Sequence, residues 1–116
     1  MIVGVQGTSS FDNYNIFLRA MSVALSSMKE NDNEFIIYTV GPAKINNFVS
    51  EFCNLSERGM KARGKKIKFY NTAPSWLNDN INQLDYFAFL SKPGESKSKL
   101  IYTAESKNIE VGIFKY

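Results

Sequence analysis

The stretch Ile2-Val3-Gly4-Val5-Gln6-Gly7-Thr8-Ser9-Ser10 opens the chain and decides how the rest is read. A short apolar run stops at Gly7, three hydroxyl side chains follow, and a helical pattern begins within a few residues. This order predicts a strand, buried on both faces over Ile2–Val5, that delivers a small polar turn to a helix N-terminus. Because helix N-termini carry unpaired N–H groups and partial positive charge, such a turn suits a phosphate or carboxylate.

The same strand-then-helix alternation continues along the chain. Apolar side chains recur at three- and four-residue spacing from Ile16 to Met28, which indicates a helix on a sheet, capped by Asp12 or Asn13. Further strands are predicted over Glu34–Val40, Ile67–Tyr70, Asp85–Leu90 and Glu110–Phe114. A second helix is predicted over Ala43–Glu57, with Leu55 on its apolar face. A third, short helix is predicted to begin at Pro74 or Ser75, and its inward-facing residues are Trp76, Leu77, Ile81 and Leu84. A fourth helix is predicted over Lys99–Asn108. The pattern β-α-β-α-β-α-β-α-β predicts one Rossmann-like α/β domain over residues 1–116, with a doubly wound parallel five-stranded sheet in three layers.

Composition places the chain among ordinary globular domains. Of its 116 residues, 44% are hydrophobic and 22% charged, which fits one domain with a single core. No apolar run approaches the roughly 20 residues of a membrane span, and the N-terminus lacks the pattern of a signal peptide, so a cytoplasmic protein without membrane contact is expected. The single cysteine, Cys53, lies in an apolar stretch and is predicted to be structural.

The absence of histidine limits the chemistry. With His 0 in the composition, Ser-His and Cys-His nucleophilic pairs are excluded and a zinc site is not expected. We therefore expect neither a metal nor a cofactor. The net charge of +3 suits a small anion but is too weak by itself to indicate nucleic acid, which is disfavoured as a partner.

Three turns are expected to meet at one edge of the sheet. In a doubly wound sheet, ligands bind at the carboxyl ends of the strands where the strand order reverses, here between the first and fourth strands. The predicted ligand-binding residues are Gly7, Thr8, Ser9, Ser10 and Phe11 after the first strand, Gly41, Pro42 and Ala43 after the second, Trp76 after the third, and Lys92, Pro93, Gly94, Ser96, Lys97 and Ser98 after the fourth. Glycine, hydroxyls and lysine are what a phosphate cradle is made of. Each turn alone also fits an ordinary capping loop, and Trp76 alone also fits a core residue.

Two common phosphate motifs are missing. The pattern G-x-G-x-x-G does not follow the first strand, and Gly94-Glu95-Ser96-Lys97-Ser98 lacks the first glycine of a P-loop. The turns Gly7-Thr8-Ser9, Gly41-Pro42-Ala43 and Gly94–Ser98, taken in order, instead resemble the SLOG superfamily. This superfamily comprises Rossmann-like domains that include DprA and the lysine-decarboxylase-like LOG proteins, and the likeness is greatest to its small YspA-like branch.

That resemblance implies a function. It implies binding of nucleotides or nucleotide-derived signals, and in some members cleavage of N-glycosidic bonds. The Pro-Gly-Gly-x-Gly-Thr-x-x-Glu motif of the phosphoribohydrolase branch does not occur in this sequence, so the resemblance supports binding better than catalysis.

We therefore expect a module that holds or sequesters a small anionic ligand, such as a nucleotide, a cyclic nucleotide or an ADP-ribose-like molecule. The first alternative is a nucleotide N-glycoside hydrolase with Glu95 or Asp12 as the acid. The second is a nucleic-acid or protein adaptor that uses the basic run Arg58–Lys68, although a solvated helix end and loop explains this run equally simply. The small size and the Asn- and Lys-rich composition suggest a phage protein, and homo-oligomers are left open.

Overall fold

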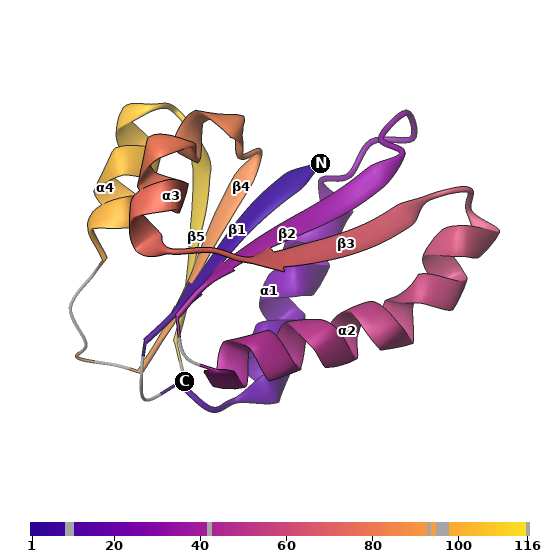
Figure 1. The fold of residues 1–116 in the computed structure, drawn as a ribbon, viewed down its shortest axis with the longest axis horizontal. Coiled ribbons are helices and arrows are strands. Elements are labelled where there is room, and N and C mark those ends of the chain that lie inside the picture. Colours follow the sequence, from indigo (N-terminus) through magenta and orange to yellow (C-terminus); the bar gives the residue numbers. More distant parts are fainter. Residues whose placement is uncertain (9–10, 42, 93, 95–97, 116) are drawn as a thin grey trace.

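The computed structural model describes residues 1–8, 11–41, 43–92, 94 and 98–115. Within them, five parallel strands form one sheet in the order β3-β2-β1-β4-β5. The strands are β1 (Ile2–Gly7), β2 (Glu34–Val40), β3 (Lys66–Asn71), β4 (Tyr86–Ser91) and β5 (Glu110–Lys115). The helices are α1 (Tyr14–Ser26), α2 (Ala43–Ala62), α3 (Pro74–Asp79) and α4 (Lys99–Ser106), with a 3-10 turn η1 (Ile81–Gln83). Helices α1 and α2 cover one face, while α3 and α4 cover the other (Figure 1). The predicted three-layer α/β fold is confirmed.

The strand order reverses between β1 and β4. The chain first moves outward from β1 through β2 to β3, then returns to place β4 on the other side of β1. Residues of the two strands pair directly, from Val3 with Tyr86 to Gly7 with Leu90. Because all strands are parallel, the ends of β1, β2 and β4 lie at one edge of the sheet, as the sequence predicts.

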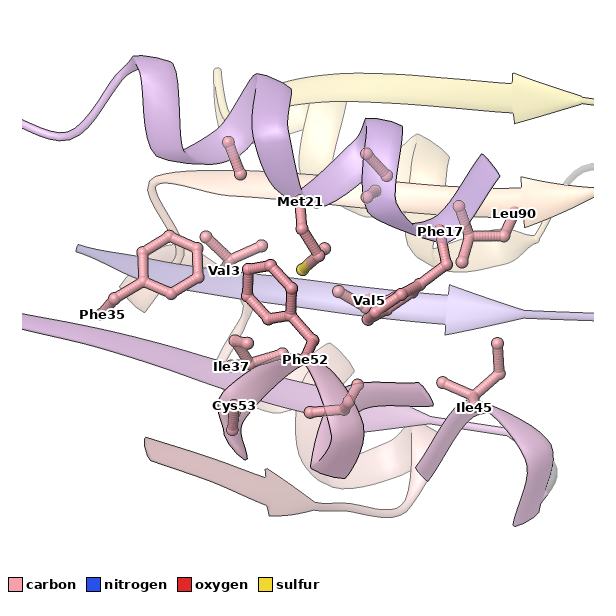
Figure 2. Packing of buried hydrophobic residues seen from close by; sticks show 14 of the residues in the cluster. Val3, Val5, Phe17, Met21, Phe35, Ile37, Ile45, Phe52, Cys53 and Leu90 are labelled. Carbon is pink, nitrogen blue, oxygen red and sulfur yellow. The ribbon is translucent and has the colours of Figure 1, made fainter. Parts of the chain in front are cut away.

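Each face of the sheet has its own apolar core. Between the sheet and α1 and α2, side chains from both helices interdigitate with β1 and β2 (Figure 2), and they include Val3, Val5, Phe17, Met21, Phe35, Ile37 and Phe52. The opposite core joins α3, η1 and α4 to the sheet through Val40, Leu77, Ile81, Phe87, Phe89, Leu100 and Ile101. All six residues of β4 are buried, which explains why this strand is apolar from Tyr86 to Leu90 before it ends at Ser91. None of the helices in the described ranges is long and apolar enough to cross a membrane.

Helix α2 is longer than the sequence suggests. We predict an end at Glu57 because Gly59 looks like a helix breaker, yet the helix continues to Ala62. Gly59 points into open space, and Met60, only 5% exposed, anchors the extra turn in the core. After Ala62 the helix is closed by Gly64, which has a φ of 72°. The N–H of Gly64 donates to the carbonyl of Lys61, and the N–H of Lys65 donates to the carbonyl of Met60.

Three side chains lie differently from prediction. Leu55 does not join the apolar face of α2 and is 70% exposed. Trp76 does not point into the core: its ring lies against the ring of Tyr38, and the residue is 38% exposed. The third helix stops at Asp79, and the buried Ile81 follows it in η1. Lys65, within the basic run, is not solvated. Its ammonium donates to the carbonyls of Lys29, Glu30 and Asp32, so it ties the end of α2 to the turn before β2.

Candidate ligand site at the carboxyl edge of the sheet

The glycines after β1 and β2 are used for internal packing. A Cβ on Gly7 would lie 2.5 Å from Cδ1 of Ile45, so the missing side chain makes room for α2. Gly41 has a φ of 126°, and a Cβ there would lie 2.8 Å from the carbonyl oxygen of Gly7. The ends of β1 and β2 therefore touch each other and α2. Close packing explains both glycines without a ligand, against the Ile45 side chain at Gly7 and against the Gly7 backbone at Gly41.

The first turn also uses its backbone groups internally. The N–H of Thr8 donates to Leu90 O (3.1 Å), and the N–H of Phe11 donates to Thr8 O (3.1 Å). Phe11 is fully buried and meets Phe48 edge to face, so in this conformation its ring offers no surface on which a base could stack. Helix α1 is capped by Asn13, whose side chain accepts from the N–H of Ile16 (3.1 Å).

A closed polar network lies on the same side of the edge. The Thr39 hydroxyl donates to Oδ1 of Asn46 (2.7 Å) and accepts from Nδ2 of Asn71 (3.1 Å). Asn71 Nδ2 also reaches Asn46 Oδ1 (2.8 Å). These three side chains join β2, α2 and β3, and they satisfy one another. We call this filled region, made of Gly7, Gly41, Ile45 and this network, the closed side.

The opposite side of the same edge is hollow. A pocket of about 420 Å³ opens between the beginnings of α3 and α4 and reaches down to β1. It is lined by Gln6, Pro74, Ser75, Asn78, Ser98, Lys99 and Leu100. Its volume falls within the range usual for small-molecule sites. We call this region the hollow side; it lies where the strand order reverses, as expected for an open α/β sheet.

The hollow side contains a buried polar atom that has no hydrogen-bond partner among the described residues, Oε1 of Gln6. Within the same part of the chain, Oγ of Ser91 at the end of β4 also has none, but Ser91, only 1% exposed, is not among the residues that line the pocket. A buried acceptor without a partner costs free energy, and most such atoms in native proteins are paired. Gln6 lines the pocket, so its oxygen is available to a hydrogen-bond donor that enters there.

Helix α4 brings positive charge to the rim. Ser98 caps the helix by accepting from the N–H of Leu100 (3.2 Å), and Lys99 follows as an exposed first helical residue. The side chain of Asn78 is positioned by α4, because its Oδ1 accepts a hydrogen bond from the Thr103 hydroxyl (3.0 Å). The pocket thus combines a buried acceptor, hydroxyl and amide groups, and one ammonium at a helix N-terminus, where anions are favoured.

The predicted site residues divide among these regions. Gly7, Thr8, Phe11 and Gly41 belong to the closed side, and Ala43 begins α2 beside them. Of the predicted residues that the structure describes, only Ser98 lines the pocket. Lys92 is half-buried after β4, and Gly94 has a φ of 87° with open space around it. Ser9, Ser10, Pro42, Pro93, Ser96, Lys97 and the candidate acid Glu95 lie outside the described residues. Asp12, the other candidate acid, is exposed before α1, a helix of the opposite layer from α3 and α4.

Sequence reasoning missed most of the pocket. Gln6, Ser75, Asn78 and Lys99 are not among the predicted ligand residues, although all of them except Asn78 lie directly beside one in the sequence. Gln6 carried a usable signal: it is the one polar side chain in the otherwise apolar run before Gly7. A polar residue inside a buried strand needs a partner, and this requirement points to a pocket. Trp76, one of the predicted ligand-binding residues, lies against Tyr38 and is outside the pocket lining.

Titratable groups elsewhere are consistent with structural roles. Cys53 is 7% exposed, and burial, assisted by Glu57, raises its pKa to about 11, so the thiol is neutral at pH 7. Burial, then the charge of Glu51, raises the pKa of Tyr14, whose ring stacks on Phe17. Among the described side chains, no group of three or more acidic residues or cysteines is placed to hold a metal ion.

Comparison with family models, with curated proteins and with solved structures found no match to this chain.

Proposed function

We propose that the chain binds a small anionic ligand derived from a nucleotide, in the hollow side between α3 and α4. The observation that carries this proposal is the buried, unpartnered Oε1 of Gln6 at the floor of a pocket with Lys99 at its rim. A ligand that fits must bring a hydrogen-bond donor to Gln6 and a negative charge to Lys99. A ribose hydroxyl or a base amino group supplies the first, and a phosphate supplies the second.

The position of the pocket supports this ligand class. It lies over Gln6 at the carboxyl end of β1, beside the point where the strand order reverses, which is where doubly wound sheets hold phosphate-bearing ligands. The resemblance of the turns to the SLOG superfamily points to the same class of ligand, through residues mostly different from those that line the pocket. The proposal is limited to binding, because no described carboxylate lines the pocket and a glycosidase requires one beside the bond it cleaves.

A panel of ligands tests the proposal. Thermal unfolding is followed with mononucleotides, cyclic and linear dinucleotides, ADP-ribose and NAD. A ligand at a hundredfold excess over its Kd stabilises the folded state by about 2.7 kcal/mol, which raises Tm measurably. No shift with any member of the panel would overturn the proposal. Chromatography of each mixture after incubation then separates binding from cleavage.

Two lysines of α4 provide a matched pair of variants. Lys99 begins the helix at the pocket, while Lys107 follows its last turn, and both are exposed. We expect Lys99→Gln to weaken binding of a phosphate-bearing ligand about tenfold, since one charge-assisted hydrogen bond is lost. Lys107→Gln makes the same chemical change away from the pocket and should leave the affinity unchanged. Equal losses in the two variants would show that general charge, and not this pocket, attracts the ligand.

A further inference from the structure

The edge of the sheet at β3 presents an ordered row of backbone hydrogen-bonding groups. Within the described residues, β3 pairs with β2 alone. The N–H of Lys66 donates to Asn33 O (2.9 Å) and that of Thr72 donates to Thr39 O (2.8 Å), so both point toward β2. Because the backbone direction alternates along a strand, the N–H and C=O groups of Ile67, Phe69 and Asn71 point away from the sheet.

A groove follows this edge on the side of α2. Two adjoining hollows of about 340 Å³ each lie between α2 and β3, and they share Glu57, Ile67 and Lys68. One is completed by Cys53, Asn54, Phe69 and Tyr70, and the other by Lys61, Lys65 and Lys66. Phe69 is 39% exposed beside the groove. Helix α2 runs along β3 for most of the strand, which gives the groove its length (Figure 1).

The two faces of β3 differ in character. Ile67 packs with the core under α2, and alternation places Phe69 on the same face. Lys66, Lys68 and Tyr70 alternate onto the other face, where the Tyr70 ring stacks on Tyr38 at 5.6 Å. A strand laid beside β3 would therefore meet Ile67 and Phe69 of β3, together with Lys61 of α2, on the groove face. On the other face it would meet the side chains of Lys66 and Lys68.

Charge selects the occupant. The groove lining has four lysines and one acidic residue, Glu57. Lys65 is committed to backbone carbonyls before β2, and Lys68 is 3.7 Å from Glu34, which leaves a positive balance at the edge. Lysines on an edge strand discourage pairing with strands in general. The lysines would attract an acidic strand. They would repel a second copy of this chain, because that copy would bring its own lysines to the edge.

We propose that the open edge of β3 and the groove beside α2 bind an extended acidic peptide segment of a partner protein as a sixth strand. Its backbone pairs with the outward groups of Ile67, Phe69 and Asn71. Its side chains alternate, with apolar residues in the groove next to Phe69 and acidic residues next to Lys66 and Lys68. Main-chain pairing supplies affinity and the alternating side chains supply specificity, as in other cases of strand addition. A nucleic acid could meet the lysines but could not complete the backbone ladder.

Amide hydrogen exchange measured by NMR tests the proposal residue by residue. The probe is a blocked eight-residue peptide of alternating glutamate and valine, and the comparison peptide alternates lysine and valine. We expect the acidic peptide to slow exchange at Ile67, Phe69 and Asn71 about tenfold, with little change at Lys66, Lys68 and Tyr70, whose amides already face β2. Equal binding of the two peptides, or protection without this alternation, would overturn the proposal.

Phe69 allows the backbone contribution to be isolated. Phe69→Ala keeps the outward N–H, while Phe69→Pro removes it without removing a bond to β2, a position where edge strands tolerate proline. The acidic peptide should bind Phe69→Ala and lose about tenfold or more of its affinity for Phe69→Pro. Equal affinities would contradict strand addition.

Two further measurements keep the test decisive. If Phe69→Pro does not fold, two versions of the acidic peptide are used instead, one N-methylated at its odd-numbered residues and one at its even-numbered residues. Only one version should lose binding, because only alternate N–H groups of the peptide would point toward β3. Concentration-dependent protection of the same amides without peptide would assign the edge to a second copy, and protection by oligothymidylate would assign it to nucleic acid. Either result would overturn the proposal.

Discussion

The closed side and the hollow side of the carboxyl edge are built from similar residues with opposite results. Hydroxyl and amide side chains occur on both, yet Gly7 and Gly41 bring backbone and α2 into contact on the closed side, while Gln6, Ser75 and Ser98 surround a pocket on the hollow side. On the closed side Thr39, Asn46 and Asn71 satisfy one another. On the hollow side Gln6 Oε1 has no partner among the residues that the structure describes. The difference teaches that turn composition alone does not separate packing from binding, whereas the hydrogen-bond balance does.

The largest effect is expected for Gly41→Ala. A side chain there faces both an unfavourable φ of 126° and a contact 2.8 Å from Gly7 O, a backbone atom that cannot rotate away. We expect the free energy of unfolding to fall by about 3 kcal/mol, measured by urea denaturation. Gly64→Ala is the matched control, because its φ is also positive (72°) but nothing lies within 4 Å, and about 1 kcal/mol is expected. Equal losses would mean that the closed side is not tightly packed at Gly41.

Gly7→Ala should cost less, about 2 kcal/mol, because Gly7 has no left-handed φ and its close neighbours are side-chain atoms. The new methyl group would lie 2.5 Å from Cδ1 and 2.7 Å from Cγ1 of Ile45, and Ile45→Val removes the nearer of these two atoms. The double variant should therefore be more stable than the sum of the single changes predicts, by about 1 kcal/mol. Strict additivity in denaturation experiments would show that Ile45 does not fill the space left by Gly7.

The fold was predictable from sequence because apolar spacing carries it. The strand and helix order follows from period-two and period-3.6 patterns, and the fully buried β4 was visible as an uninterrupted apolar run. The end of α2 could not be predicted in the same way. A glycine that faces open space, such as Gly59, looks like a helix breaker in the sequence although the helix continues through it. Lys65 was misread for a similar reason, since its buried ammonium depends on carbonyls more than thirty residues away.

The pocket of the hollow side lies at the edge of the sheet where the sequence predicts a site, but its described lining includes few of the predicted residues. The position at the strand reversal follows from topology alone. The lining depends on how α3 and α4 face each other, and this comes from tertiary packing around Leu77, Leu100 and Ile101. Glycine-rich turns drew attention to Gly7 and Gly41, where the structure uses them for close approach. Gln6 was the informative residue, because a buried polar side chain requires a partner.

A smaller loss is expected for Thr39→Val on the closed side. The change keeps the shape of the side chain and removes the hydroxyl that donates to Asn46 and accepts from Asn71. Asn46 and Asn71 still bond each other at 2.8 Å, so the loss should be limited to about 1 kcal/mol in urea denaturation. A loss near zero would mean that the network is exchanged for water, and the closed side would then not be closed.

The smallest change in stability, and the sharpest contrast, is expected for Gln6→Leu on the hollow side. This substitution also replaces a buried polar group by an apolar one, but Gln6 Oε1 has no protein partner to lose. The free energy of unfolding without ligand should therefore stay within about 0.5 kcal/mol of the original value or rise. The affinity for a responding nucleotide should nevertheless fall about tenfold, because the ligand loses its acceptor.

Gln83→Leu is the matched control at an exposed glutamine outside the pocket lining, where the ligand affinity should not change. If Gln6→Leu instead destabilised the protein as much as Thr39→Val, Gln6 would be satisfied within the fold, and the two sides would not differ in the way that makes one of them a binding site.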